Sequence, residues 1–234
     1  MSANRLIPAV DVRLGGLLEF TRRNEIEKSR RVVADNVRPT ITLSREFGCE
    51  AYPVAERLKE VLEKKTGESW MIMDKALLEE VAKNHNLSED MLKGLGEKAR
   101  FLDEILATFS PGWKSEKDHF KLICRQMLSL AGKGNVILVG RGGAIVTQKL
   151  KNCSHFRMYA SQQFKVRSIS KRLDISKDEA AVMIQKKQKQ RDDFIRDFLD
   201  RDSRDLSCYN LVFNNDRNSA EKIAKTIVEY VLSD

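Results

Sequence analysis

Residues 136–143 have the sequence VILVGRGG, and this stretch gives the clearest indication of the fold. Four consecutive apolar residues are typical of a strand buried on both faces, and the glycines directly after them predict a tight turn. In open α/β sheets, ligands bind at the carboxyl ends of the strands. Arg141 in this turn offers a planar, forked set of donors suited to phosphate. The turn is therefore a candidate anion site, although an ordinary turn with an exposed arginine has the same pattern.

Further short apolar segments surround this strand, and longer amphipathic stretches separate them. We expect five strands, at about 40–44, 69–73, 136–140, 155–160 and 209–214. Strands that alternate with helices are typical of an α/β domain with a mainly parallel sheet. Right-handed crossovers then bring Gly48 and Gly140 to the same edge of that sheet.

Length and composition narrow the class of protein. The 234 residues fit one large domain, or one domain with an arm, and 41% hydrophobic with 32% charged residues is typical of a globular chain. No apolar run approaches the ~20 residues of a membrane span, and no secretory signal is apparent. Single scattered cysteines suit a reducing compartment and do not have the spacing of a zinc site; they are Cys49, Cys124, Cys153 and Cys208. We expect a cytoplasmic protein without a structural metal.

Positive charge is concentrated in one segment. The chain has a net charge of +8, and residues 165–191 contain nine basic and three acidic residues. This excess favours an anionic partner, either a nucleotide or other phosphorylated small molecule or a nucleic acid, unless it is only a solvated helical face. The segment lacks the interleaved aromatic residues of a single-stranded nucleic-acid site, so we do not expect nucleic acid to be the partner.

Residues 1–38 form a candidate helical arm. Leu14, Leu17, Leu18 and Ile26 recur at roughly helical spacing among many charges, and Pro39 ends the segment. Such an arm packs either on the body of the domain or on a second copy of the chain, which leaves a homo-oligomer open.

The first strand-to-helix turn, SREFGCEAYP at 44–53, is a poor phosphate cradle. A phosphate loop has the pattern GxxxxGK[ST], whose glycines free backbone N–H groups and whose lysine neutralises charge. Only Gly48 corresponds to that pattern, and Glu50 would bring negative charge to phosphate. These residues alone favour an ordinary turn.

From Thr40 to its end, the chain resembles the cytidylate kinase-like branch of the P-loop nucleoside monophosphate kinases. The resemblance rests on ITLSREFG at 41–48, Asp74, VILVGRGGAIV at 136–146 and RDDFIRDFLDRDSRDLSCYNLVFNNDR at 191–217. It implies a three-layer α/β/α P-loop NTPase-like fold with a five-stranded parallel sheet over residues 39–234. Residues 75–131 would be a helical acceptor-side insertion and 162–199 a helical lid. The implied reaction moves the γ-phosphoryl group of ATP to a nucleoside monophosphate with Mg²⁺.

The resemblance also assigns residue roles. Arg141 corresponds to an arginine that holds the acceptor nucleotide, and Lys165 and Arg191 correspond to lid cations that meet the transferring phosphate. These three are the candidate catalytic residues, and Asp74 is a candidate on the acceptor side. No metal ligand is assigned. The candidate nucleotide-binding residues are Arg45, Gly48, Cys49, Glu50, Ala51, Tyr52, Gly140 and Gly142.

The chain departs from the family at two of these positions. Ala51 stands where cytidylate kinases have the phosphate-loop lysine, and Gly142 stands where they have an acidic residue. The leading hypothesis is therefore a nucleotide-binding protein with weak or absent kinase activity. One alternative is a competent kinase, using ATP and Mg²⁺, in which Arg45, Arg141 and Arg191 replace the lysine. Another is a non-catalytic regulatory or protein-interaction module that retains the kinase fold.

Overall fold

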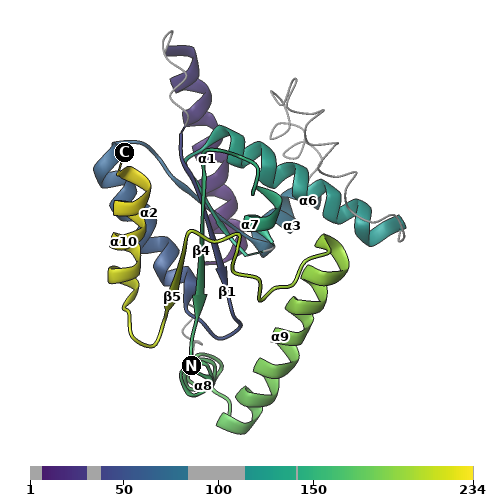
Figure 1. Ribbon diagram of the computed structural model, residues 1–234. Helices are drawn as coiled ribbons and strands as arrows, with labels where there is room; N and C mark the ends of the chain where they lie inside the picture. Colours follow the sequence, from purple (N-terminus) through teal and green to yellow (C-terminus); the bar gives the residue numbers. More distant parts are fainter. Residues whose placement is uncertain (1–6, 31–37, 84–113, 141, 234) are drawn as a thin grey trace.

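A five-stranded parallel sheet forms the centre of the computed structural model, which describes residues 7–30, 38–83, 114–140 and 142–233 (Figure 1). The strand order is β2-β3-β1-β4-β5, and every neighbouring pair is parallel. The strands are β1 (Thr40–Arg45), β2 (Met71–Asp74), β3 (Val136–Val139), β4 (Cys153–Tyr159) and β5 (Leu211–Asn214). The predicted sheet is confirmed, with strand ends that differ from the expected ones by one or two residues.

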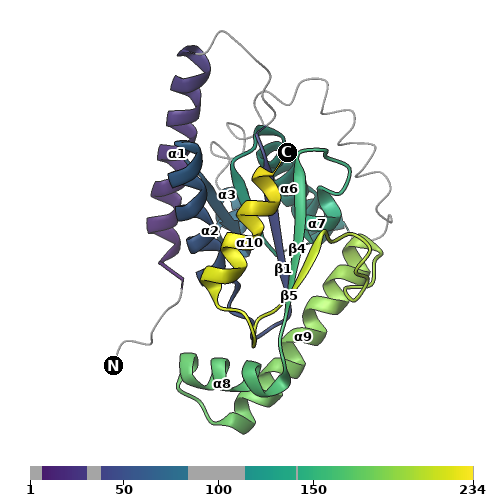
Figure 2. The same ribbon diagram turned by 60° about the vertical axis from the view of Figure 1, so that its left-hand side comes forward.

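Helices cover both faces of the sheet, which gives the three-layer α/β/α arrangement (Figures 1 and 2). On one face, α2 and α10 pack over Ile41, Leu43 and Phe156. On the other, α3, α6 and α7 pack over Met73, Val136 and Leu138. The helices of these two layers are α2 (Ala51–Thr66), α3 (Lys75–Lys83), α6 (Lys114–Lys133), α7 (Gly143–Val146) and α10 (Ala220–Leu232).

The N-terminal arm is a helix, α1 (Val10–Arg30), that packs on the body of the same chain. Leu17 and Phe20 are buried in the core beside α3 and α6. Arg13 Nη1 lies 2.6 Å from Asp74 Oδ1 at the end of β2, and both side chains are about nine-tenths buried. Of the two predicted packing modes, the contact with the body is therefore present.

Two helices, α8 (Gln162–Leu173) and α9 (Lys177–Leu199), lie beyond the carboxyl ends of the strands (Figure 1). The α9 helix begins at a capping box made by Ser176 and Glu179, which stabilises its first turn. At its other end, Phe194 and Phe198 stack on each other and meet Phe120 of α6 edge-on. The predicted lid is thus one short and one long helix, and the long helix is anchored in the core at its C-terminal end.

None of the helices within the described ranges is long and apolar enough to cross a membrane. The centre of the predicted acceptor-side insertion, residues 84–113, lies outside the described residues.

Candidate phosphate and ligand site

The turns after β1 and β3 lie side by side at the carboxyl edge of the sheet. Leu43 of β1 is in register with Val139 of β3, and the N–H of Gly140 donates to the Leu43 carbonyl at 3.1 Å. Because all strands are parallel, Gly48 and Gly140 are at the same edge, as the sequence predicted. The two predicted phosphate-binding segments therefore belong to one region.

The phosphate turn, defined here as residues 46–50, uses its own N–H groups inside the protein. The N–H of Phe47 donates to Gln188 Oε1 of α9 at 2.7 Å, and that of Glu50 donates to Asn215 Oδ1 at 2.9 Å. The N–H groups of Glu46 and Cys49 donate to backbone carbonyls. A phosphate loop works by directing such donors at the ligand, so this turn has few left to offer.

The side chains of the phosphate turn bind the lid in the same way. Lys165 Nζ lies 2.9 Å from Glu46 Oε2, and Ser168 donates to Glu50 Oε1 at 2.7 Å. Gly48 has a φ of +97°, and a Cβ there would come within 2.7 Å of the Lys165 Cβ, so glycine is required for α8 to approach. The predicted lid cation Lys165 does reach the phosphate turn, but a carboxylate of the turn already binds it.

The remaining predicted residues, in the turn and at the start of α2, are buried. Cys49 and Ala51 lie in the core, and Tyr52 is 8% exposed with the Arg13 guanidinium 6.0 Å from its ring centroid. Burial, with the nearby charge of Glu46 as the next cause, raises the pKa of the Cys49 thiol to about 12. Cys49 is therefore a neutral core residue and not a thiolate nucleophile.

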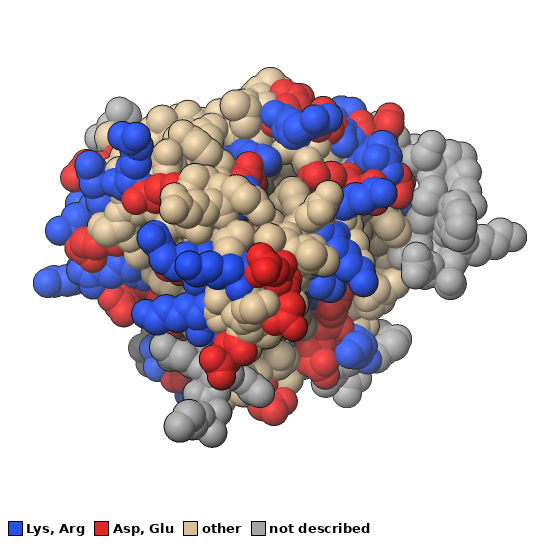
Figure 3. Space-filling model, turned by 90° about the horizontal axis from the view of Figure 1, so that it is seen from below, with Lys and Arg blue, Asp and Glu red and all other residues tan. Residues whose placement is uncertain are grey.

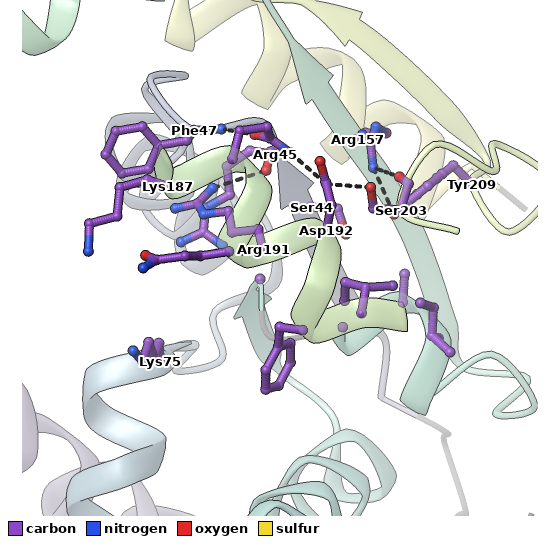
Figure 4. A pocket seen from close by; sticks show the side chains of 18 residues that line it. Ser44, Arg45, Phe47, Lys75, Arg157, Lys187, Arg191, Asp192, Ser203 and Tyr209 are labelled. Atoms are coloured by element: carbon purple, nitrogen blue, oxygen red, sulfur yellow. Dashed lines mark hydrogen bonds between the residues drawn. The ribbon is translucent and has the colours of Figure 1, made fainter. Parts of the chain in front are cut away.

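The main cavity, of about 400 Å³, lies between α9 and the ends of β1, β3 and β4 (Figure 4). Its volume is in the range of a small-molecule site. Among the residues that the structure describes, five cationic side chains and one carboxylate, that of Asp192, line it. The cations are Arg45, Lys75, Arg157, Lys187 and Arg191.

The wall of the main cavity on the side of the phosphate turn is a polar network on α9. Arg191 donates to the Arg45 carbonyl at 3.2 Å, and its guanidinium lies 5.1 Å from the Phe47 ring centroid. Asp192 Oδ1 accepts hydrogen bonds from Gln188, at 2.8 Å, and from Ser203, at 2.5 Å. Arg191 and Asp192 are consecutive, so α9 presents a cation and an anion together.

The glycine turn after β3 leaves space for the Arg45 side chain. Gly140 has a φ of +79°, and a Cβ there would lie 1.6 Å from Arg45 Nη1, so the guanidinium occupies the space of the missing side chain. Gly142 has a φ of +71° and precedes α7, and a Cβ there would meet Leu199 at 2.3 Å. Arg141, the predicted acceptor arginine between them, lies outside the described residues.

Asp74, predicted on the acceptor side, is bound within the protein. Its Oδ1 accepts one hydrogen bond from Arg13 Nη1 and another, at 3.0 Å, from the Leu77 N–H. The second bond caps the first turn of α3. Asp74 lines a second cavity of about 200 Å³, which the phosphate turn and Ile7 also border. The N-terminal arm therefore closes this side of the region.

Sequence reasoning missed several residues of the main cavity. Residues that line it but were not among the predicted site residues include Lys75, Arg157, Lys187, Asp192, Ser203 and Tyr209. The basic segment 165–191 includes Lys187, and the family-like stretch 191–217 includes the last three of these residues, but neither signal gave them a role. On the surface that includes α8 and α9, basic and acidic side chains are interspersed (Figure 3).

No cluster of three or more potential metal ligands occurs in the described parts of the chain.

Solved structures that match the chain include one uncharacterized protein and two kinases. An uncharacterized protein from Eubacterium ventriosum matches with a TM-score of 0.65 and 19% identity, over 83% of this chain and 98% of that one. Shikimate kinase from Bacteroides thetaiotaomicron matches with a TM-score of 0.43 and 14% identity, over 82% and 98%. Dephospho-CoA kinase from Campylobacter jejuni matches with a TM-score of 0.35 and 12% identity, over 83% and 97%.

No curated protein sequence matched the chain. A family model matches residues 40–217, a segment that runs from β1 through both lid helices to just beyond β5. Only α1, with the residues around it, and the closing helix α10 fall outside the match. The chain therefore belongs to the cytidylate kinase-like family.

Proposed function

We propose that this protein binds a nucleotide, or a similar phosphorylated small molecule, in the main cavity and transfers phosphoryl groups very slowly or not at all. One contrast carries the proposal: the N–H groups of the phosphate turn are used inside the protein, whereas five cations line the cavity beside it. Membership of the family supports a nucleotide as the ligand.

The binding half of the proposal rests on charge and shape. The Arg45 guanidinium lies over Gly140, and Arg191 of α9 donates to the Arg45 carbonyl. Lys75 and Lys187 line the same cavity and add positive charge to it. Charge-assisted hydrogen bonds from arginine to phosphate are about twice as strong as neutral ones. A phosphate group at this end of the cavity would offset the mutual repulsion of the cations.

The catalytic half rests on what the phosphate turn lacks. Phosphoryl transfer needs donors and positive charge preorganised around the β- and γ-phosphates. Here the donors are engaged, Lys165 is paired with Glu46, and Glu50 adds negative charge. The turn therefore does not fit the triphosphate of ATP, and we expect no magnesium-dependent ATP site there. Removing one such stabilising group typically costs ~10²–10³ in rate.

The rival function is a competent kinase in which arginines replace the missing lysine. It is favoured by the position of Arg191, which lines both the main cavity and the smaller one beside the phosphate turn. In this mechanism, Arg191 would stabilise the charge on the transferring group.

Calorimetry and a coupled kinase assay on the full chain separate these functions. We expect CMP, UMP or dCMP to bind, Mg-ATP to bind poorly, and turnover to lie far below the ~10 s⁻¹ of an ordinary enzyme. Arg191→Ala should weaken monophosphate binding about 10- to 100-fold, the loss of one charge-assisted contact. Lys171→Ala, an exposed cation outside both cavities, is the control.

Each contrary result has a defined meaning. Turnover of about 10 s⁻¹ that Arg191→Ala abolishes would establish the rival kinase. No binding of any nucleotide would contradict the proposal and favour an interaction module that retains only the fold.

A further inference from the structure

Arg157 is a buried cation that forms no direct ion pair within the described residues. It belongs to β4, and 8% of its surface is exposed. Its Nη1 donates to the Ser203 carbonyl at 2.5 Å and to the Tyr209 hydroxyl at 3.4 Å. Asp202 senses its charge from a distance, because hydrogen bonds from Arg204 lower the pKa of that carboxyl most and the charge of Arg157 lowers it further. A buried charge without a directly paired counter-ion is unfavourable, so the burial of Arg157 calls for an explanation.

The position of Arg157 supplies one, because its side chain lines the main cavity. Figure 4 shows Arg157 and Tyr209 on one side of the cavity and Arg45, Arg191 and Phe47 on the other. Asp192 lies between the two groups and is occupied by the donors Gln188 and Ser203. The cavity thus has two cationic ends and a polar middle.

The contacts of Arg157 hold its guanidinium in a defined orientation. One nitrogen is tied to the segment between α9 and β5, and the Tyr209 ring centroid lies 5.6 Å from Arg157 Cζ. Arginine carries five N–H donors in a rigid fork that fits carboxylate or phosphate. Both of these hydrogen bonds use Nη1, so a ligand in the cavity could approach the Nη2 and Nε donors without breaking them.

We propose that Arg157 binds a second anionic group of the ligand, so that the natural ligand carries a phosphate at the Arg45–Arg191 end and a carboxylate or second phosphate at the Arg157 end. This inference rests on the proposed function, and it narrows the ligand to small molecules with two separated anionic groups. The competing explanation is structural: Arg157 would serve only to hold the Ser203 carbonyl.

Two matched pairs of probes test the proposal by calorimetry on the full chain. Glycerol 3-phosphate and 3-phosphoglycerate differ in a carboxylate, and CMP and cytidine 3′,5′-bisphosphate differ in a phosphate. In at least one pair, we expect the probe with two anionic groups to bind at least tenfold more tightly. The pair that shows this gain identifies the second group as carboxylate or phosphate.

Variants then assign the gain to Arg157. Arg157→Gln should abolish it and change the affinity for the probe with one anionic group less than twofold. Arg157→Lys, which keeps the charge without the fork, should retain part of the gain and serves if the glutamine variant does not fold. Arg204→Gln is the matched control, because Arg204 is an exposed arginine of the same segment, paired with Asp202.

Two outcomes would overturn the proposal, and a third would contradict the proposed function. Equal affinities within both pairs for the wild-type protein would exclude a second anion subsite. A gain that survives Arg157→Gln would assign it to another residue and leave Arg157 a structural role. Failure of all four probes to bind the wild-type protein would instead contradict the proposed function on which this inference rests.

Discussion

The phosphate turn and the main cavity lie at the same edge of one sheet, yet they differ in electrostatic state. Arg45, Phe47 and Arg191 line both the main cavity and the smaller cavity beside the turn. In the turn, both carboxylates have partners on α8, and four of the five N–H groups donate to other groups of the protein. Among the described residues, five cations and one carboxylate line the cavity. Within a few residues, one edge of the sheet therefore changes from a turn whose polar groups are paired to a cavity lined by cations.

The largest loss of stability should come from breaking the ion pair between Arg13 of the N-terminal arm and Asp74, which closes the side of the phosphate turn. Arg13→Gln leaves the buried carboxylate of Asp74 without its cation, and we expect a loss of about 2–4 kcal/mol in the free energy of unfolding. Urea denaturation measures it. Arg23→Gln on the same helix breaks only an exposed pair with Glu19 and should cost less than about 0.5 kcal/mol. Equal losses would show that α1 does not close this side through Asp74.

Acid should lower the free energy of unfolding through His155, which lies in β4 of the central sheet. Burial lowers the pKa of His155 from 6.5 to about 4, and its Nδ1 lies 2.9 Å from Thr42 Oγ1. Between those pH values, the unfolded chain binds a proton that the folded chain does not, so stability falls as pH drops from about 6.5 to 4, by at most about 3 kcal/mol. Denaturation curves across this range should lose that component in His155→Gln and keep it in the control His119→Gln. An unchanged slope in His155→Gln would contradict the prediction.

A glycine substitution tests whether Arg45 contributes to binding in the main cavity. Gly140→Ala adds a methyl group where the Arg45 guanidinium lies, whereas Gly67→Ala, also at positive φ, meets open space. Both variants share the backbone strain of about 1 kcal/mol, so the difference between them reports the displacement of Arg45. We expect Gly140→Ala to weaken monophosphate binding severalfold and Gly67→Ala to leave it unchanged. Equal affinities would show that Arg45 does not contribute to the site.

The smallest effect should come from Glu46→Gln, which releases Lys165. The pair is partly buried, so we expect a loss of about 1 kcal/mol or less in stability. With its carboxylate partner gone, Lys165 should raise the affinity for inorganic phosphate two- to threefold, as measured by calorimetry. Glu60→Gln, in an exposed pair with Arg57, is the control. No gain would mean that charge pairing does not keep anions from the turn.

The sheet was predictable because its signals are local. β2, β3 and β5 are short, mainly apolar runs, and the VILVGRGG segment contains both a strand and its turn. The Ser176–Glu179 capping box is equally local, since its two residues are three positions apart. The order of the strands in the sheet was not predicted, because it depends on pairing between segments that are distant in sequence.

The candidate site was less predictable because its decisive contacts are distant in sequence. Gln188 lies 141 positions from Phe47, and Asn215 lies 165 positions from Glu50. Neither residue type signals such a role. Arg157 was hidden for a similar reason: one arginine in an apolar strand is conspicuous only once the lid is known to leave a cavity beside it.

The aromatic contacts of Phe120, Phe194 and Phe198 fix the C-terminal end of α9 against the core. The 23 residues of α9 span about 34 Å, and Leu199 at this fixed end fills the space over Gly142. Moving the whole helix would break these apolar contacts. We therefore expect ligand exchange to proceed by movement of α8 and the N-terminal part of α9. This movement would break the polar contacts of the two helices with Glu46, Phe47 and Glu50, and the packing of Phe47 against their apolar cluster.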